Sequence, residues 1–291
     1  EMQRSLVGSE MCIRDSLISY SPARVAKGDN SSNVVERAIE YWNGDEGKRG
    51  IVTLCWHWCP AARYDKSKSD PWGTFYTDKT KFNLARAMNG RDPDGYQMLL
   101  DDIDAIAVQL KRLQDADVPV LWRPLHEASG GWFWWGASGA DAYLQLYKLM
   151  YDRLTNVHGL NNLIWVWNGQ DAAWYPGDEY VDIIGEDIYP GKHVYTSQAA
   201  RFIKALSYTD TRKLITLSEN GCIPDPEQLV RDNIMWSYWC VWEGEFVLKA
   251  AGFNNYSEQY TEKNMLKKAY KSDTVITRKE LPDLRNYPLG D

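Results

Sequence analysis

The sequence lacks the marks of several classes of protein. None of its apolar runs approaches the ~20 residues that a membrane-spanning helix needs, and its first residues contain no apolar core like that of a secretory signal peptide. Internal repeats and low-complexity segments are absent. The 291 residues carry a formal net charge of −7 with a pI near 5.3, which argues against nucleic acid or an anionic membrane as a partner. A neutral or polymeric substrate is compatible with this charge.

The cysteines do not occur in the paired spacings of a metal or redox motif. The five cysteines are odd in number and form no Cys-x-x-Cys pair. If residues 55–59 formed a strand, Cys55, His57 and Cys59 would share one face and suggest a zinc site. No second group of ligands accompanies them, so buried thiols beside a polar histidine are the better interpretation. We expect neither a metal nor a cofactor.

Tryptophan, in contrast, is abundant. The chain has 14 tryptophans, and ten of them lie between Trp122 and Trp242. One interpretation is a bulky hydrophobic core. The other is a cleft whose flat aromatic faces stack on sugar rings, because tryptophan is large and seldom fully buried. Composition alone leaves both open.

Patterns typical of strands alternate with patterns typical of helices from residue 50 onward. Strands are expected at 51–56, 118–122, 163–167, 181–188, 214–217 and 234–242, and helices at 101–113, 141–154, 198–206 and from 225 on. Such alternation predicts an α/β fold with a parallel sheet, and the length fits a (β/α)8 TIM barrel. Two more strands would have to come from the first fifty residues, where 17–20 is a plausible candidate and 5–8 a poor one. We interpret residues 1–16 as a truncated or non-native first-strand region and residues 17–291 as the barrel domain.

The ends of the expected strands carry the candidate chemistry, because the active site of such a barrel lies at the C-terminal ends of its strands. The residues found there are His57, Glu127, Trp167 with Asn168, Asp187 with Tyr189, Glu219 and Trp242. Two glutamates at two strand ends suggest a retaining glycosidase, in which two carboxyl groups face each other at about 5–5.5 Å. Three of the polar residues in this region also have purely structural interpretations. Glu127 could pair with Arg123, Glu219 could enter a turn, and His126 could be a satisfied core histidine.

The surroundings suggest how the two glutamates would divide the work. Glu127 neighbours many aromatic residues, and desolvation raises the pKa of a carboxyl, which suits a general acid. Glu219 would have to stay ionised to act as a nucleophile. Asn220 or the hydroxyl of Tyr189 could hold its oxygens by hydrogen bonds, and Arg123 could add positive charge that lowers its pKa.

Several motifs together carry a resemblance to a known family. They are RPLHEASGGWFWWG at 123–136, LNNLIWVW at 160–167, YPGDEYVDIIG at 175–185, DIY at 187–189 and SENG at 218–221, with WHW at 56–58 and the two tryptophans at 236 and 242. Through them the sequence, from about residue 19 to the C-terminus, resembles glycoside hydrolase family 26, whose members are mostly bacterial endo-β-1,4-mannanases. The resemblance implies a (β/α)8 barrel with catalytic glutamates after strands four and seven and a retaining mechanism. The family's first strand cannot be recognised before about Leu17.

The resemblance also implies roles for single residues. By position, Glu127 matches the acid/base and Glu219 the nucleophile. Substrate-binding roles are implied for His57, Arg123, His126, Trp132, Trp167, Asp187, Tyr189 and Trp242. Among these, Trp132 matches a stacking wall and Tyr189 the tyrosine that steadies the nucleophile, while His126 stands where the wider clan usually has asparagine.

The leading hypothesis is therefore a secreted or cell-surface endo-β-1,4-mannanase acting on mannan, glucomannan or galactomannan. We expect a monomer, or one module of a larger enzyme. The rival within the same class is another β-glycanase, such as a mixed-linkage β-glucanase or a β-1,3-xylanase. The rival from another class is a non-catalytic carbohydrate-binding barrel, which would keep the tryptophans without needing both glutamates.

Overall fold

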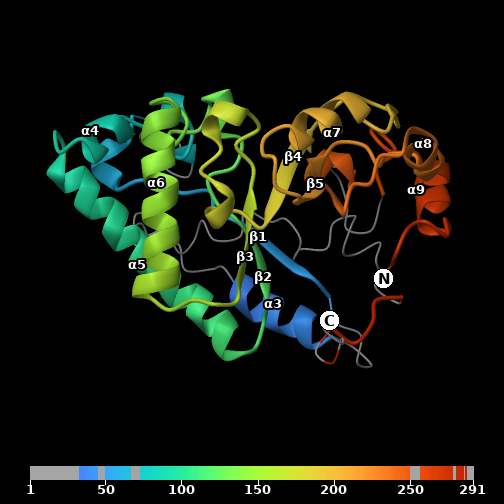
Figure 1. Cartoon of the computed structure of the whole chain (residues 1–291), viewed down its shortest axis with the longest axis horizontal. Coiled ribbons are helices and arrows are strands. Elements are labelled where there is room, and N and C mark those ends of the chain that lie inside the picture. Colours follow the sequence, from blue (N-terminus) through green and yellow to red (C-terminus); the bar gives the residue numbers. More distant parts are fainter. Residues whose placement is uncertain are drawn as a thin grey trace.

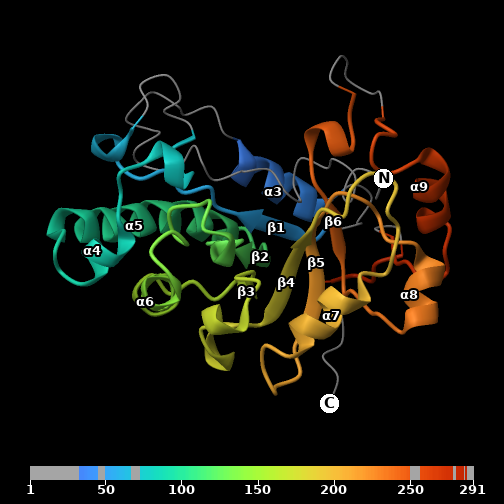
Figure 2. The ribbon, with the colours of Figure 1, turned by 90° about the horizontal axis from the view of Figure 1, so that it is seen from above.

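Six parallel strands form one sheet whose order in space follows the order of the chain. The computed structural model describes residues 33–44, 50–66, 73–249, 256–277, 280–284 and 286. The strands are β1 (Val52–Cys55), β2 (Val120–Arg123), β3 (Leu163–Trp167), β4 (Ile183–Ile188), β5 (Leu214–Asn220) and β6 (Trp239–Val241). Every neighbouring pair is parallel, so all the C-terminal strand ends lie at one edge. Figures 1 and 2 show the strands succeeding one another as the sheet curls.

Helices connect most of these strands on the outside of the sheet (Figure 1). The α-helices are α3 (Val34–Asn43), α4 (Leu84–Met88), α5 (Pro93–Asp115), α6 (Ala140–Asp152), α7 (Ala199–Leu206), α8 (Pro226–Asp232) and α9 (Lys263–Tyr270). A π-helical turn, Arg153–Val157, extends α6. The 3-10 turns are Ala62–Tyr64, Thr77–Lys79, Ala128–Gly130, Ala172–Trp174, Asp178–Tyr180 and Gly244–Phe246. The link from β3 to β4 contains 3-10 turns alone, whereas α5, α6, α7 and α8 lie in the other links between neighbouring strands.

Local sequence explains where two of these helices begin. The side chain of Asp92 caps α5 by accepting a hydrogen bond from the N–H of Gly95 (2.9 Å), and Pro93 occupies the first turn. Asp225 caps α8 in the same way through the N–H of Glu227 (3.0 Å), ahead of Pro226. The predicted start of this helix at residues 225–227 is therefore confirmed.

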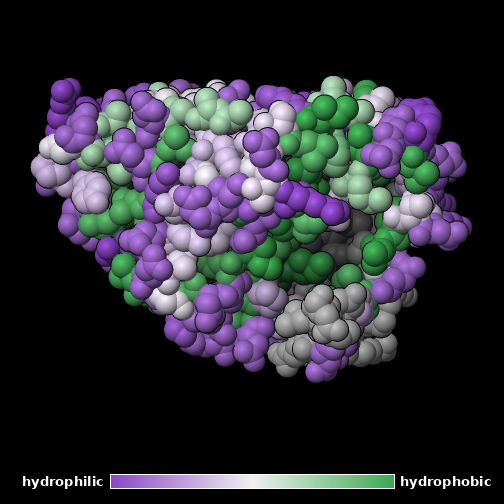
Figure 3. Space-filling view, in the orientation of Figure 1, coloured by the Kyte–Doolittle hydropathy of each residue, from purple (hydrophilic) through white to green (hydrophobic). Residues whose placement is uncertain are grey.

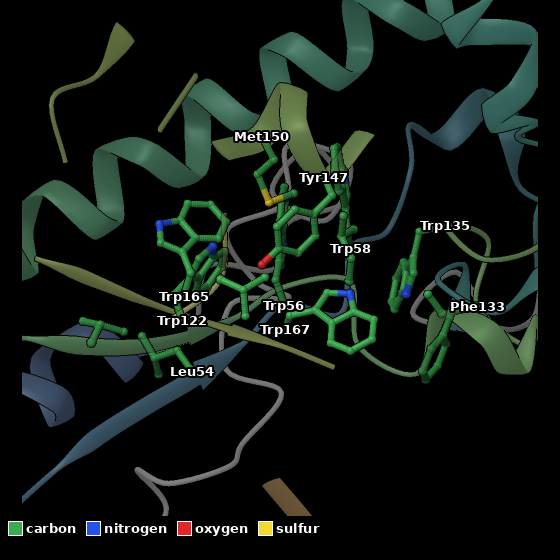
Figure 4. Close-up of a cluster of buried hydrophobic side chains, with 14 of the residues drawn as sticks. Leu54, Trp56, Trp58, Trp122, Phe133, Trp135, Tyr147, Met150, Trp165 and Trp167 are labelled. Atoms are coloured by element: carbon green, nitrogen blue, oxygen red, sulfur yellow. The ribbon is translucent and has the colours of Figure 1, made fainter. Parts of the chain in front are cut away.

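Most of the tryptophans form the core. Figure 4 shows Trp56, Trp58, Trp122, Trp135, Trp165 and Trp167 among the buried side chains between the sheet and its helices. Trp134, Trp236 and Trp239 are also buried, and Trp132 is an exception, with 47% of its surface exposed. The bulky-core interpretation is thus correct for most of them. Some of their indole N–H groups help to hold loops in place, as when Trp134 donates to the carbonyl of Trp58 (2.6 Å).

The six strands expected after residue 50 are confirmed, with corrections at several of their ends. The strand expected at 214–217 continues to Asn220, so Glu219 lies within it. Residues 56–59 lie beyond β1, so the strand-face argument for a zinc site fails. The strand expected at 234–242 is limited to Trp239–Val241, because an apolar run alone does not fix strand length. The predictions for residues 1–16, including the strand at 5–8, and for the strand at 17–20 lie outside the described residues.

Polar side chains predominate on the face of the molecule that Figure 3 shows. Hydrophobic side chains gather over α7 in this view, where Ile203 and Leu206 are exposed. No helix in the described part of the chain is long and apolar enough to cross a membrane.

Candidate active site

A buried cation at the end of β2 joins two neighbouring strand ends. The guanidinium of Arg123 donates through one Nη to Oδ2 of Asp187 on β4 (2.9 Å) and through the other to Oε1 of Glu219 on β5. The side chains of Arg123, Asp187 and Glu219 are 4%, 0% and 4% exposed. Because a buried carboxylate is stable only when it is paired or hydrogen-bonded, Arg123 accounts for the position of both.

A bulge in β5 sets the direction of these side chains. Glu186 and Asp187 of β4 lie opposite Leu217 and Glu219, so Ser218 is one extra residue of β5. The register toward β6 is shifted in the same stretch. Bulges re-aim side chains and are common beside active sites. Here Ser218 donates to Oδ1 of Asp187 (2.6 Å) and thereby closes the local network.

Glu127 enters the same cluster from a strained turn after β2. Its backbone is left-handed (φ 53°), a conformation that a non-glycine residue keeps only when its surroundings enforce it. Asn168, which is completely buried, enforces it by accepting two hydrogen bonds from the N–H of Glu127, on its carbonyl (2.8 Å) and on Oδ1 (3.1 Å). Oxygens of Glu127, Asp187 and Glu219 all lie within 4.8 Å of one another.

Asn168 was named at a strand end, but the sequence analysis gave it no role. It also contacts Arg123 (3.3 Å) and donates to Oγ of Ser218 (3.2 Å), so one side chain ties Glu127 to the buried cation and to the bulge. The available signal was its place directly after the apolar run 163–167, the same kind of place that marked the two glutamates.

Burial raises the pKa of all three carboxyls, because an ionised carboxylate loses its hydration inside the protein. The pKa of Glu127 and of Asp187 rises to about 7, and that of Glu219 to about 8. Burial is the largest cause of each shift, and the neighbouring charges and hydrogen bonds act beside it.

The hydrogen-bond donors differ between the two glutamates. Arg123 and the hydroxyl of Tyr189 (2.5 Å) both donate to Glu219 and lower its pKa against the effect of burial. Glu127 instead accepts from the neutral indole of Trp132 (2.9 Å), and its hydrogen bond with the side chain of Asp187 requires a shared proton. A cation and a hydroxyl donor favour the negative charge on Glu219, whereas Glu127 has only a neutral indole donor beside it.

Two aromatic side chains next to the carboxyls are open to solvent. Trp132 is 47% and Tyr189 is 42% exposed. One face of the Trp132 ring lies against Gly130, where an added Cβ would come within 2.1 Å of the ring, so only glycine permits this approach. An exposed indole whose N–H is held by Glu127 is suited to stack on a ring bound over the carboxyls.

A second group of side chains gathers beside the cluster. His57 lies 4.8 Å from His126 and 6.4 Å from Trp242 between ring centroids, and Phe133 contacts both histidines. Burial, with Arg123 nearby, lowers the pKa of His57 to about 3 and that of His126 well below its usual value. Both imidazoles are therefore neutral at ordinary pH and offer polar atoms without charge.

Two residues considered in the sequence analysis do not contact the carboxyl cluster through their side chains. Trp167, expected to bind substrate, is completely buried and packs edge-on against Tyr175 (5.0 Å) and Tyr208 (5.2 Å) in the core. Alternate residues of a strand face opposite sides, so Asn168 reaches the cluster instead of Trp167. Asn220, considered as a partner of Glu219, donates to the carbonyl of Cys222 (2.6 Å).

Within the described residues, one group of three acidic or ligating side chains is close enough to hold a metal ion: Glu127, Asp187 and Glu219. Arg123 already neutralises two of these carboxylates, which disfavours a cation between them. Cys55, His57 and Cys59 form no such group, which removes the geometric basis for the zinc interpretation.

Comparison with known proteins agrees with this geometry. The family described as Glycosyl hydrolase family 26 matches residues 3–280. A mannan endo-1,4-beta-mannosidase of Thermothelomyces thermophilus is 44% identical over 266 residues, which cover 91% of this chain and 52% of that protein. Mannan endo-1,4-beta-mannosidase A of Piromyces sp is 38% identical over 86% of this chain and 38% of its own length. The chain thus spans about half or less of these relatives.

Solved structures show the same similarity. The Podospora anserina GH26-CBM35 beta-(1,4)-mannanase superposes with a TM-score of 0.80 at 39% identity, covering 91% of this chain and 56% of that one. A beta-mannanase from a symbiotic protist of the termite Reticulitermes speratus, complexed with a gluco-manno-oligosaccharide, gives a TM-score of 0.72 at 36% identity over 86% of this chain and 72% of its own.

Proposed function

The chain belongs to glycosyl hydrolase family 26, and from this membership and the geometry of its carboxyl cluster we propose that it is a retaining endo-β-1,4-mannanase. The observation that carries the proposal is the short separation of Glu127 and Glu219, whose oxygens lie within 4.8 Å. Retaining glycosidases hold their two carboxyls about 5–5.5 Å apart, whereas inverting ones leave about 6.5–9.5 Å for a water molecule. The proposed substrates are mannan, glucomannan and galactomannan.

The proposed mechanism assigns a task to each residue of the cluster. Glu219, ionised and held by Arg123 and Tyr189, attacks the anomeric carbon of a β-mannosyl unit. Glu127 gives its proton to the departing glycosidic oxygen, so the bond to the leaving sugar breaks as the bond to Glu219 forms. Glu127 then takes a proton from water, and the resulting hydroxide displaces Glu219 with overall retention of configuration.

The surrounding residues provide the proposed substrate contacts. Trp132 stacks on a sugar ring beside the cleaved bond, with its position fixed by Glu127 and Gly130. His57, His126 and Trp242 line the other part of the cleft, and the two neutral imidazoles hydrogen-bond sugar hydroxyls. Arg123, itself paired with Asp187, orients the nucleophile.

The eight-stranded barrel and the location outside the cell form part of the same proposal. If two strands precede β1 in an eight-stranded barrel, Glu127 and Glu219 follow strands four and seven, as the family resemblance implies. A polymeric mannan lies outside the cell, so the enzyme is expected to be secreted or held at the cell surface. It acts as a monomer or as one module of a larger enzyme, in keeping with the greater length of its relatives.

Azide rescue of two variants tests the mechanism. With an aryl β-mannoside carrying a good leaving group, Glu219→Ala should lose nearly all hydrolysis, and added azide should restore turnover to give the inverted α-mannosyl azide. Glu127→Ala should instead give the β-mannosyl azide, because azide attacks the glycosyl-enzyme formed on Glu219. Glu179→Ala, at an exposed site, is the control. Full hydrolysis in Glu219→Ala, or the same azide anomer from both variants, would contradict the proposal.

Substrate choice needs a separate measurement. Product analysis on mannan, lichenan and xylan distinguishes a mannanase from a mixed-linkage β-glucanase or a β-1,3-xylanase. Release of manno-oligosaccharides of mixed length supports the endo-mannanase. Binding to mannan without release of any product identifies the non-catalytic carbohydrate-binding alternative.

A further inference from the structure

A polar network behind the cluster connects Asp187 to the outer helix α7. The backbone N–H of Asp187 donates to Oε1 of Gln170, in the loop after β3, at 3.2 Å. The same oxygen accepts a hydrogen bond from Arg201 of α7 at 2.9 Å. One side-chain oxygen thus bridges a residue of the carboxyl cluster and a cation on the outside of the sheet.

The other end of this network is anchored in the core. Glu186, which is completely buried, accepts from Arg201 through Oε2 (2.5 and 3.0 Å) and from the hydroxyl of Tyr208 through Oε1 (2.8 Å). Because a buried carboxylate needs these partners, Arg201 is held firmly in place. Glu186 and Asp187 are neighbours on β4, so the network fixes the strand on both of its sides.

The network lies where the backbone hydrogen bonds between β4 and β5 are irregular. The register of β4 against β5 shifts between Glu186 and Asp187, and bulges disrupt the regular backbone bonds of a ladder. The N–H of Asp187 is satisfied by the Gln170 side chain at this point. Gln170 itself keeps a left-handed backbone (φ 61°), which a non-glycine residue adopts at a local cost, and Lys204 bonds its carbonyl (3.1 Å).

We propose that Gln170 is a positioning residue, which sets the backbone of Asp187 and through it the Arg123–Glu219 pair. Asp187 occupies one Nη of Arg123, and the other holds Glu219, so a displaced Asp187 changes the direction of the guanidinium. The inference rests on the proposed hydrolytic function, although Gln170 has no role in the chemistry itself. A displacement of about 1 Å at a catalytic group can lower a rate by up to about a hundredfold.

Three variants separate positioning from general stability. Gln170→Met keeps the size of the side chain and removes the acceptor, whereas Gln170→Glu keeps an acceptor. Gln114→Met is the matched control: its amide also bridges two backbone groups, the N–H of Asn161 (2.7 Å) and the carbonyl of Gly159 (3.2 Å), before β3 begins. Those contacts lie at the opposite end of β3 from Gln170.

The expected result is a selective loss of kcat. Gln170→Met should lower kcat by about tenfold or more with little change in KM, Gln170→Glu should restore most of it, and Gln114→Met should keep native kcat. Tm is measured in parallel, so that a change in folding is seen separately. Native kcat in Gln170→Met, an equal loss in Gln114→Met, or no recovery in Gln170→Glu would overturn the inference.

A second measurement does not depend on activity. Hydrogen exchange at the amide of Asp187 should be faster in Gln170→Met than in the native chain, and unchanged in Gln114→Met. Unchanged exchange in Gln170→Met would also overturn the inference. If the native chain cleaves a β-glycan other than mannan, kcat is compared on that substrate. If it cleaves none, the proposed function fails while the exchange result still decides whether Gln170 positions Asp187.

Discussion

Replacing Arg123 with methionine should give a stability loss that grows with pH. The guanidinium is 4% exposed and is the cation paired with both Asp187 and Glu219. Removing one partner of a buried ion pair costs about 3–5 kcal/mol, because the other charge is left uncompensated. A protonated carboxyl avoids this cost, so the loss depends on whether the carboxyls are ionised.

The direction of the pH effect follows from the raised pKa values. In the native chain the pKa of Asp187 is about 7 and that of Glu219 about 8, both above the ordinary values of 3.8 and 4.5. The free energy of unfolding therefore falls as pH rises from the ordinary pKa values to the raised ones. Without Arg123 both pKa values rise further. If the folded variant then keeps one more proton than the native chain, its free energy of unfolding falls by about 1.4 kcal/mol more per pH unit.

The expected cost of Arg123→Met is therefore about 4 kcal/mol at pH 9 and clearly smaller at pH 6, where a larger share of the carboxyls is protonated. Urea unfolding at pH 6, 7, 8 and 9 measures it. Arg112→Met, which removes a surface pair with Glu36, is the control and should cost less than about 1 kcal/mol at every pH. A loss in Arg123→Met that is equal at pH 6 and pH 9 would refute the electrostatic argument and assign the effect to packing.

Three further predictions concern the side chains around the glutamates. Trp132→Phe removes the indole donor to Glu127 and so raises the pKa of that carboxyl. The alkaline limb of the kcat/KM profile should move upward by about 0.5–1 pH unit, and an unmoved limb would show that the indole does not lower the pKa of Glu127. Tyr189→Phe removes a hydrogen bond to Glu219 and should lower kcat by about 10- to 100-fold with Tm nearly unchanged, so a native kcat would exclude this role. Asn168→Ala keeps the carbonyl that accepts from the Glu127 N–H but removes the side-chain bonds to Glu127, Arg123 and Ser218. It should lower the free energy of unfolding by about 2 kcal/mol and reduce kcat as well, and a variant as stable and active as the native chain would contradict this.

Position in the sequence was a good guide to which residues meet, and a poor guide to which way they face. Apolar runs predicted the six strands, and parallel strands place their C-terminal ends at one edge, so Arg123, Asp187 and Glu219 could be expected together. Trp167 was assigned to the cleft although its side chain points into the core. The side that a strand residue faces depends on twist and register, which the apolar pattern of a strand buried on both faces does not reveal.

The sequence by itself determined the α/β class, the order of the strands and the family, and it placed the two glutamates at the ends of predicted strands. These follow from periodicity and from motifs, which are local properties of the chain. The tertiary structure decided that most tryptophans are core, that Ser218 forms a bulge, and that Asn168 and Gln170 hold the backbones of Glu127 and Asp187. These contacts join residues on different strands and loops, and the burial that raises the pKa of the carboxyls exists only in the folded chain.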